Sequence, residues 1–235
     1  MAKIKKCIIV TGMHRSGTSL TSGIISKMGF DTGKIAKGDA SNKTGYFENL
    51  DVMNNNQDLL VYLNTNWTSD KPLPKDWRKK TGQYYKNLKN ILSNFNTNNV
   101  VIKDPRICRL FPMFKDAMAE LNIDMKVVLS FRNPYDVAGS LMARNTIDEA
   151  SALKLWNAYY DDILNTASGV DRSIVFYDDL LDRSKEAFEA LRIFVGGNKM
   201  SGELVKNKLR HNKTNKYPSG KTKEIYDYLL ANKHI

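Results

Sequence analysis

The chain has little cysteine and histidine and no long hydrophobic run. Among its 235 residues are two cysteines, Cys7 and Cys108, and three histidines without metal-ligand spacing. A disulfide framework and a metal site are therefore not expected. No run of about eighteen apolar residues occurs, so a membrane-spanning helix is not expected either. These absences favour a protein of the reducing cytoplasm.

A signal peptide is not expected either. The first apolar strand, Cys7–Val10, begins so close to Met1 that no leader or membrane anchor is expected before it. The length of 235 residues suits one domain with a substantial core. We therefore expect a single domain over residues 1–235.

Acidic residues are outnumbered by basic ones, with 25 Asp and Glu against 36 Lys and Arg and a net charge of +11. Nucleic-acid-binding proteins often have such a balance. Here the lysines are scattered, mainly in Lys71–Lys89, Lys199–Lys223 and both termini, without a basic stripe interleaved with aromatic residues. A positive field also steers small anionic ligands into a cleft. We therefore expect anionic ligands and no nucleic-acid partner.

The most informative segment is the turn after the first strand, Gly12–Leu20, with the sequence GMHRSGTSL. Backbone N–H groups of a Gly-bounded loop and of the following helix N-terminus converge on an anion. The two glycines have the spacing of a Walker A loop, but Thr18 stands where that loop has its lysine. The cation, Arg15, lies inside the loop. The segment is therefore predicted to bind a phosphate ester other than a nucleoside triphosphate.

A second phosphate-binding pattern lies in Val127–Ser140. Four β-favouring residues place Arg132 at a strand end, and Pro134 begins a helix at its preferred first-turn position. Ser140 lies off the apolar stripe of that helix, so Arg132 and Ser140 can reach one group above the sheet edge. A guanidinium and a hydroxyl together suit a phosphate monoester. The alternative is a surface arginine and a helix serine without a shared ligand.

Apolar strands alternate with helix-period segments along the rest of the chain. The expected helices cover about 48–63, 83–95, 107–121 and 147–167, and the expected strands cover 100–103 and 173–177. One helix should follow the last strand, with Leu181, Phe188, Leu191 and Val195 on one side. Such alternation predicts an α/β protein, a P-loop-like three-layer fold with a central parallel sheet flanked by helices and ligands at the carboxyl ends of the strands. Thr65–Lys80, with two prolines and two tryptophans, is expected to be irregular and either to shape an acceptor pocket or to be a packed surface loop.

The two phosphate-binding segments resemble those of sulfotransferases that use 3′-phosphoadenylyl sulfate (PAPS). Members of this family hold the 5′-phosphosulfate with an [RK]-x-G-T-[ST] loop, and they hold the 3′-phosphate with an arginine and a serine eight residues apart, as Arg132 and Ser140 are. The residues that match the loop are Arg15, Ser16, Gly17, Thr18 and Ser19. The strings GMHRSGTSL, GYFE and KDPR are most similar to a bacterial-type branch. The similarity runs from about residue 6 to about residue 215.

The resemblance implies an enzyme that transfers a sulfuryl group from PAPS to a hydroxyl or amine, without a metal, and releases 3′-phosphoadenosine 5′-phosphate (PAP). Sulfuryl transfer should be similar to phosphoryl transfer, in which in-line positioning and charge stabilisation dominate catalysis. Arg15 and the loop amides would then hold the 5′-phosphate and neutralise the charge on the leaving oxygens. The acceptor is expected to be a small molecule or a carbohydrate, and the oligomeric state is left open.

The acceptor also needs a base, and two carboxylates compete for this role. Glu48 is the first candidate, because the resembling branch has an acidic residue in GYFE, although a glutamate there also stabilises a helix N-terminus. Asp104 is the second, because KDPR directly follows a strand, and Lys103 would supply charge to the transferred group. Asp104 and Arg106 alternatively form only a structural ion pair. Pro105 occupies the position at which many cytosolic relatives have a catalytic histidine, so no histidine base is expected there.

Four further positions have looser assignments. Tyr177 matches a tyrosine that relatives place near the adenine, and the alternative is a buried tyrosine at a strand end. His14 is expected either to contact the sulfate or to pack the loop. Leu20 replaces a tryptophan that stacks on the adenine in cytosolic relatives, so adenine packing must differ. Arg210–Lys213 lies in a late loop that brings a basic group onto the 3′-phosphate in relatives, and a solvated charge run is the alternative.

Two other function classes compete with the transferase. A small-molecule kinase, or another P-loop nucleotide enzyme, would bind a triphosphate with magnesium, and the missing Walker lysine argues against it. A protein that binds PAP without turnover would have the same phosphate motifs and differ only in its base.

Overall fold

The structure is a computed structural model, and it describes residues 4–35, 47–182, 184–199 and 214–233. Arg210–Lys213, for which a role at the 3′-phosphate was considered, lie outside the described residues. The first two residues of the GYFE string lie outside them as well.

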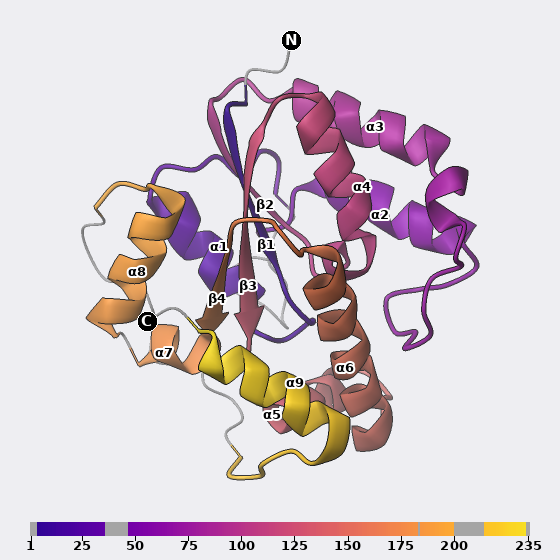
Figure 1. Cartoon of the computed structure of the whole chain (residues 1–235), viewed down its shortest axis with the longest axis vertical. Coiled ribbons are helices and arrows are strands. Elements are labelled where there is room, and N and C mark those ends of the chain that lie inside the picture. Colours follow the sequence, from indigo (N-terminus) through magenta and orange to yellow (C-terminus); the bar gives the residue numbers. More distant parts are fainter. Residues whose placement is uncertain (1–3, 36–46, 183, 200–213, 234–235) are drawn as a thin grey trace.

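A four-stranded parallel sheet, in the order β2-β1-β3-β4, forms the centre of the molecule (Figure 1). Its strands are β1 (Lys6–Thr11), β2 (Asn99–Lys103), β3 (Asp124–Phe131) and β4 (Arg172–Phe176). Val10 of β1 pairs with Lys103 of β2 on one side and with Val128 of β3 on the other. Because the strands are parallel, the segments that follow β1, β2 and β3 all leave from one edge of the sheet.

Helices cover both faces of the sheet (Figure 1). One face carries α1 (Thr18–Lys27), α7 (Tyr177–Leu181) and α8 (Lys185–Val195). The other carries α2 (Leu50–Tyr62), α3 (Gly82–Ser93), α4 (Ile107–Glu120), α5 (Pro134–Arg144), α6 (Glu149–Thr166) and α9 (Gly220–Ala231), with a short 3₁₀ helix at Trp77–Lys80. Side chains alternate along β1, so Ile8 and Val10 pack in one apolar cluster and Cys7 and Ile9 in the other.

The predicted α/β fold with a central parallel sheet flanked by helices is confirmed. The four helices and two strands given by range begin and end within about two residues of those ranges, whereas β3 begins three residues before Val127. The single helix expected after the last strand was wrong: α7 ends at Leu181, and α8 begins after Ser184, whose side chain caps it. Helix α9 was not predicted. Within the described residues, no helix is long and apolar enough to span a membrane.

Asn49 fixes the start of α2 and thereby the chain direction at Glu48. Its Oδ1 accepts a hydrogen bond from the backbone N–H of Val52 at 3.1 Å, and its Nδ2 donates to the carbonyl of Thr32 at 3.3 Å. Replacing Asn49 with alanine should lower the free energy of unfolding by about 1 kcal/mol, a loss of about 2–4 °C in melting temperature for a chain of this size. Thermal denaturation measures the change.

The matched control for this prediction is Ser184→Ala, which removes the cap of α8, where Ser184 Oγ accepts from the N–H of Ala187 at 3.1 Å. It should cost a similar amount of stability, because the capping interaction is of the same kind. A melting temperature unchanged by Asn49→Ala, beside a loss in the control, would contradict the capping role of Asn49.

Candidate functional site

The backbone of the loop between β1 and α1 is closely approached by the backbone of β3 and by the side chain of Tyr177. Gly12, Arg15 and Gly17 all have positive φ, at 143°, 69° and 89°. A Cβ atom on Gly12 would lie 2.1 Å from the carbonyl oxygen of Ser130 in β3, so only glycine fits there. A Cβ atom on Gly17 would lie 2.2 Å from the ring of Tyr177. The loop therefore passes close to β3 and to the start of α7 before α1 begins.

Ser16 supports this loop from inside the protein. Its backbone N–H donates to the carbonyl of Met13 at 3.1 Å, and its buried hydroxyl lies 3.1 Å from the hydroxyl of Tyr160 on α6. The same Tyr160 hydroxyl donates to the carbonyl of Ser130 at 2.8 Å. The N–H and the hydroxyl of Ser16 thus have internal partners, so Ser16 shapes the loop.

The two motifs that the sequence predicts to bind phosphate meet in space. Arg15 Nε donates a hydrogen bond to Ser140 Oγ of α5 at 2.8 Å, although the two residues are 125 positions apart. The Ser140 hydroxyl accepts this bond and retains its own hydrogen for another partner. A guanidinium from the loop and a hydroxyl from the second motif therefore lie side by side at the sheet edge.

Arg132 follows β3 directly and is 6% exposed. Its Nη2 lies 3.4 Å from Asp136 Oδ2, and its guanidinium lies 5.0 Å from the centre of the Tyr177 ring. The other oxygen of Asp136 accepts from the N–H of Thr214 at 2.7 Å. Tyr177 thus contacts both the loop between β1 and α1, at Gly17, and the second motif, at Arg132.

Glu48 and Lys103 form a buried ion pair beside the loop. Lys103 Nζ, at the end of β2, donates to Glu48 Oε1 at 2.6 Å and to Ser19 Oγ at 3.4 Å. The Lys103 side chain is 3% exposed and that of Glu48 is 10% exposed. Burial lowers the pKa of Lys103, and the Glu48 carboxylate opposes that shift by stabilising the charged ammonium. The sequence analysis named Glu48 as a candidate base and Lys103 as a source of positive charge, but it did not predict that they form an ion pair.

Asp104 is fully buried, and both of its oxygens have partners. Oδ2 accepts from Asn56 Nδ2 of α2 at 2.9 Å, while Oδ1 accepts from the N–H of Arg106 at 2.9 Å and from its Nη1 at 2.8 Å. Arg106 Nε also donates to Gln57 Oε1 at 3.3 Å. The geometry is that of the structural ion pair, one of the two arrangements the sequence allowed, and it joins α2 to the start of α4.

His14 packs between two aromatic rings. Its ring centre lies 4.5 Å from that of Trp67 and 5.8 Å from that of Tyr159 on α6. Burial, and then the positive charges of Arg106 and Lys103, hold the pKa of His14 well below its ordinary value. The imidazole is therefore neutral near pH 7. Trp67 lies in the segment 65–76, which precedes the 3₁₀ helix, so this segment reaches the loop between β1 and α1.

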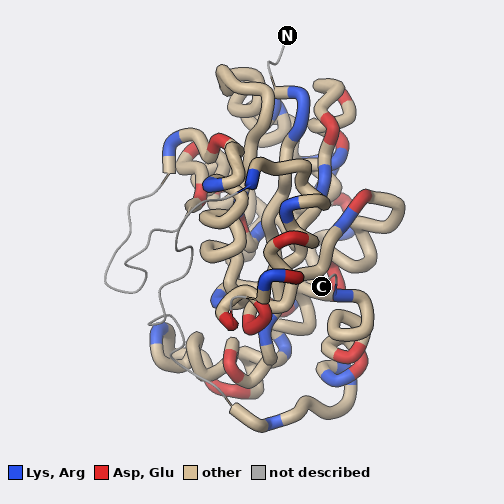
Figure 2. Tube along the Cα trace, turned by 90° about the vertical axis from the view of Figure 1, so that its left-hand side faces the viewer, with Lys and Arg blue, Asp and Glu red and all other residues tan. Residues whose placement is uncertain are grey.

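Basic and acidic positions are interspersed along the described part of the trace (Figure 2). The described residues include no group of three or more His, Cys, Asp and Glu side chains placed to hold a metal ion.

Comparison with known proteins gives matches among solved structures. No family profile matches the chain, and no curated protein matches its sequence. The sulfotransferase domain of the Synechococcus PCC 7002 olefin synthase superimposes with a TM-score of 0.52 at 15% identity, covering 96% of this chain and 94% of that domain. The sulfotransferase domain from the curacin biosynthetic pathway gives a TM-score of 0.56 at 14% identity, covering 98% of this chain and 99% of that one. The chain therefore shares the fold of these sulfotransferase domains over nearly its whole length.

Proposed function

We propose that the protein is a PAPS-dependent sulfotransferase that acts on a hydroxyl or amine of a small-molecule or carbohydrate acceptor. The observation that carries this proposal is the 2.8 Å hydrogen bond between Arg15 Nε and Ser140 Oγ. A donor with a 5′-phosphosulfate and a 3′-phosphate needs two adjacent phosphate sites, and this contact joins the two candidate sites. The shared fold with two sulfotransferase domains supports the same conclusion.

In this proposal the donor lies along the carboxyl edge of the sheet. Arg15, with N–H groups at the start of α1, binds the 5′-phosphosulfate. Arg132 and Ser140 bind the 3′-phosphate, for which the planar guanidinium is suited. Tyr177, which contacts Gly17 and Arg132, lies between the two phosphate sites and next to the adenosine. Arg15, Lys103 and Arg132 supply the positive charge, so transfer should continue in EDTA.

Glu48 is the proposed base. The acceptor oxygen or nitrogen attacks the sulfur in line, the bond from sulfur to the bridging phosphate oxygen breaks, and PAP leaves with that electron pair. Glu48 accepts the proton that the acceptor loses, and the Lys103 ammonium stabilises charge on the transferred sulfuryl oxygens. Asp104 is not the base in this scheme, because both of its oxygens are engaged with Asn56 and Arg106.

Conversion of PAPS to PAP tests the transferase against its alternatives. The purified protein is incubated with PAPS, EDTA and a mixture of phenol, sugar and amine acceptors, and the nucleotides are separated by chromatography. We expect PAP to form faster than in a protein-free control, together with a sulfated acceptor. PAP binding without conversion would instead identify a nucleotide-binding protein.

We further infer one domain over residues 1–235 and a cytoplasmic location. The two buried cysteines, Cys7 and Cys108, form no disulfide, which agrees with a reducing compartment.

Ser140 should affect both phosphate sites, because it accepts the Arg15 bond in addition to its role at the 3′-phosphate. Ser140→Ala should therefore weaken the binding of 5′-AMP, which has no 3′-phosphate, by about fivefold, the equivalent of one hydrogen bond of about 1 kcal/mol. Calorimetric titration of 5′-AMP and PAP measures the effect. If only the affinity for PAP falls, Arg15 needs no support from Ser140.

A further inference from the structure

We propose that Arg109 is a positioning residue for the acceptor. Arg109 holds the segment 67–72 against α4 and α6, and it thereby fixes Trp67 beside the phosphate loop. There the Trp67 ring stacks on the acceptor. The acceptor hydroxyl belongs to a ring, as in a phenol or a sugar. The inference rests on the proposed sulfotransferase function and adds to it the element that binds the acceptor.

Arg109 lies in the first turn of α4 and is 6% exposed. Its Nε donates to Asp162 of α6, which neutralises the buried charge. The two outer nitrogens donate to backbone carbonyls of the irregular segment, Nη1 to Ser69 at 2.7 Å and Nη2 to Lys71. One planar guanidinium therefore binds a carboxylate and two backbone carbonyls that are two residues apart in the segment. Lysine has one nitrogen and lacks this planar fork, so it cannot reproduce the arrangement.

A third carbonyl of the segment is held in the same manner. The hydroxyl of Tyr159, on α6, donates to the carbonyl of Trp67 at 2.8 Å. The Arg109 guanidinium lies 5.7 Å from the centre of the Tyr159 ring, so the two side chains that hold the segment also contact each other. Carbonyls at positions 67, 69 and 71 thus have partners on α4 and α6, although the segment has neither helix nor strand here.

The segment that Arg109 holds reaches the reaction site through Trp67. The Trp67 ring packs on His14, which directly precedes Arg15 of the phosphate loop. Trp67 is only half-buried, so part of its ring is available for another contact. Stacking on an indole suits a planar phenol and also the apolar face of a sugar. A ring bound there would carry its hydroxyl next to the loop that is proposed to hold the sulfuryl group.

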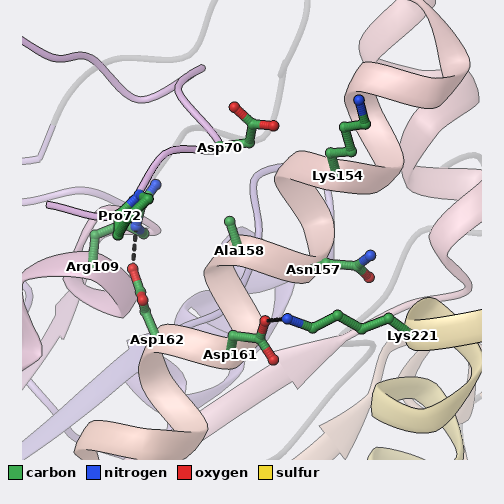
Figure 3. Close-up of a pocket in the computed structure, with 9 residues that line it drawn as sticks. All are labelled: Asp70, Pro72, Arg109, Lys154, Asn157, Ala158, Asp161, Asp162 and Lys221. Atoms are coloured by element: carbon green, nitrogen blue, oxygen red, sulfur yellow. Dashed lines mark hydrogen bonds and ion pairs between the residues drawn. The ribbon is translucent and has the colours of Figure 1, made fainter.

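The opposite end of the segment forms one wall of a cavity of about 360 Å³ (Figure 3). Asp70 and Pro72 line it from the segment, Arg109 from α4, and the remaining lining residues come from α6 and α9. Figure 3 shows Arg109 joined to Asp162 at this wall. The segment has the open cavity on this side, so the Arg109 hydrogen bonds hold this end, while the Tyr159 bond and core packing hold the end at Trp67. Loss of the Arg109 bonds should shift Trp67 through the short chain between the two ends, while the sheet and the phosphate loop stay in place.

The test uses Arg109→Gln, Arg109→Lys and Trp67→Ala, with Arg78→Gln as the matched control. Arg78 forms an exposed ion pair with Asp116 and should be replaceable without effect. PAP affinity is measured by calorimetry, and transfer from PAPS is measured with two ring-bearing probes, p-nitrophenol and methyl β-glucoside, and with a ringless amine for comparison. Acrylamide quenching of tryptophan fluorescence reports the position of Trp67, because Trp77 and Trp156 are buried.

We expect the wild type to use at least one probe. Arg109→Gln and Trp67→Ala should raise the KM for that probe about tenfold or more. The kcat should stay within about threefold of the wild-type value, and the PAP affinity within about twofold. The KM of Arg109→Lys should lie between those of the wild type and Arg109→Gln. Quenching should increase in both Arg109 variants and not in Arg78→Gln.

Three results would overturn the role of Arg109. The first is an unchanged KM in Arg109→Gln, and the second is an equal loss of acceptor and PAP binding, which indicates a general structural defect. The third is a wild type that sulfates a ringless amine and uses neither ring-bearing probe, because the acceptor would then not stack on Trp67. If Arg109→Gln does not fold, Arg109→Lys and Trp67→Ala decide by the same criteria. A wild type that fails to bind PAP would contradict the sulfotransferase proposal instead.

Discussion

Replacing Glu48 with glutamine should slow sulfuryl transfer about a hundredfold or more, because the amide cannot accept the proton that the acceptor loses. PAP affinity should stay nearly unchanged, since Glu48 binds Lys103 and is not assigned to either phosphate. Single-turnover transfer from PAPS and calorimetric titration with PAP measure the two effects separately. A fully active Glu48→Gln variant would contradict the role of Glu48 as the base.

Two controls separate this role from its alternatives. Asp51 is an exposed carboxylate in the first turn of α2, so Asp51→Asn removes a helix-stabilising charge and should leave transfer unchanged. The second control is pH. The Glu48 carboxylate raises the pKa of Lys103, so Glu48→Gln favours loss of the Lys103 proton. Lower pH would restore that proton. A defect that disappears as the pH falls would therefore originate from Lys103.

Arg132→Ala should weaken PAP binding by about 1.5–3 kcal/mol, the range for a hydrogen bond to a charged group. Arg132 is buried at the end of β3, between Asp136 and the ring of Tyr177, so its guanidinium is held in one position before the donor binds. Calorimetric titration with PAP measures the loss. The affinity for 5′-AMP, which lacks the 3′-phosphate, should be almost unchanged.

Arg132→Lys is the matched control, because it keeps the charge and loses the planar fork. We expect PAP affinity between those of the wild type and Arg132→Ala. If Arg132→Ala binds PAP as the wild type does, the 3′-phosphate lies elsewhere. An equal loss for PAP and 5′-AMP would show that Arg132 acts on the loop rather than on the 3′-phosphate.

The loop after β1, the parallel sheet and the placement of Arg132 at its carboxyl edge follow from local sequence patterns, whereas the order of the strands in the sheet was not predicted. A buried strand, two glycines and a helix stripe predict a strand–loop–helix unit, and parallel strands bring Arg132 to the edge where Arg15 lies. The contact between Arg15 and Ser140 is a consequence of that geometry. The Glu48–Lys103 pair was less predictable, because no sequence pattern indicates where the chain before α2 lies relative to the end of β2.

The missed elements have identifiable causes. Leu181 and Val195 fit one helical stripe, so the break that Ser184 makes by capping α8 was not visible in the periodicity. Helix α9 had a usable signal in the spacing of Ile225 and Leu229, which are buried where α9 packs on α6. Nothing local to Trp67 indicates its contact with His14, because that contact depends on bonds from α4 and α6.

The most direct test of the sulfotransferase proposal is a calorimetric titration of the purified protein with PAP, beside a parallel titration with ATP and magnesium. The proposal predicts PAP binding with a Kd in the micromolar range, about −8 kcal/mol, and no heat from ATP. Binding of ATP alone, strengthened by magnesium, would contradict it and would identify a kinase or another nucleoside triphosphate enzyme.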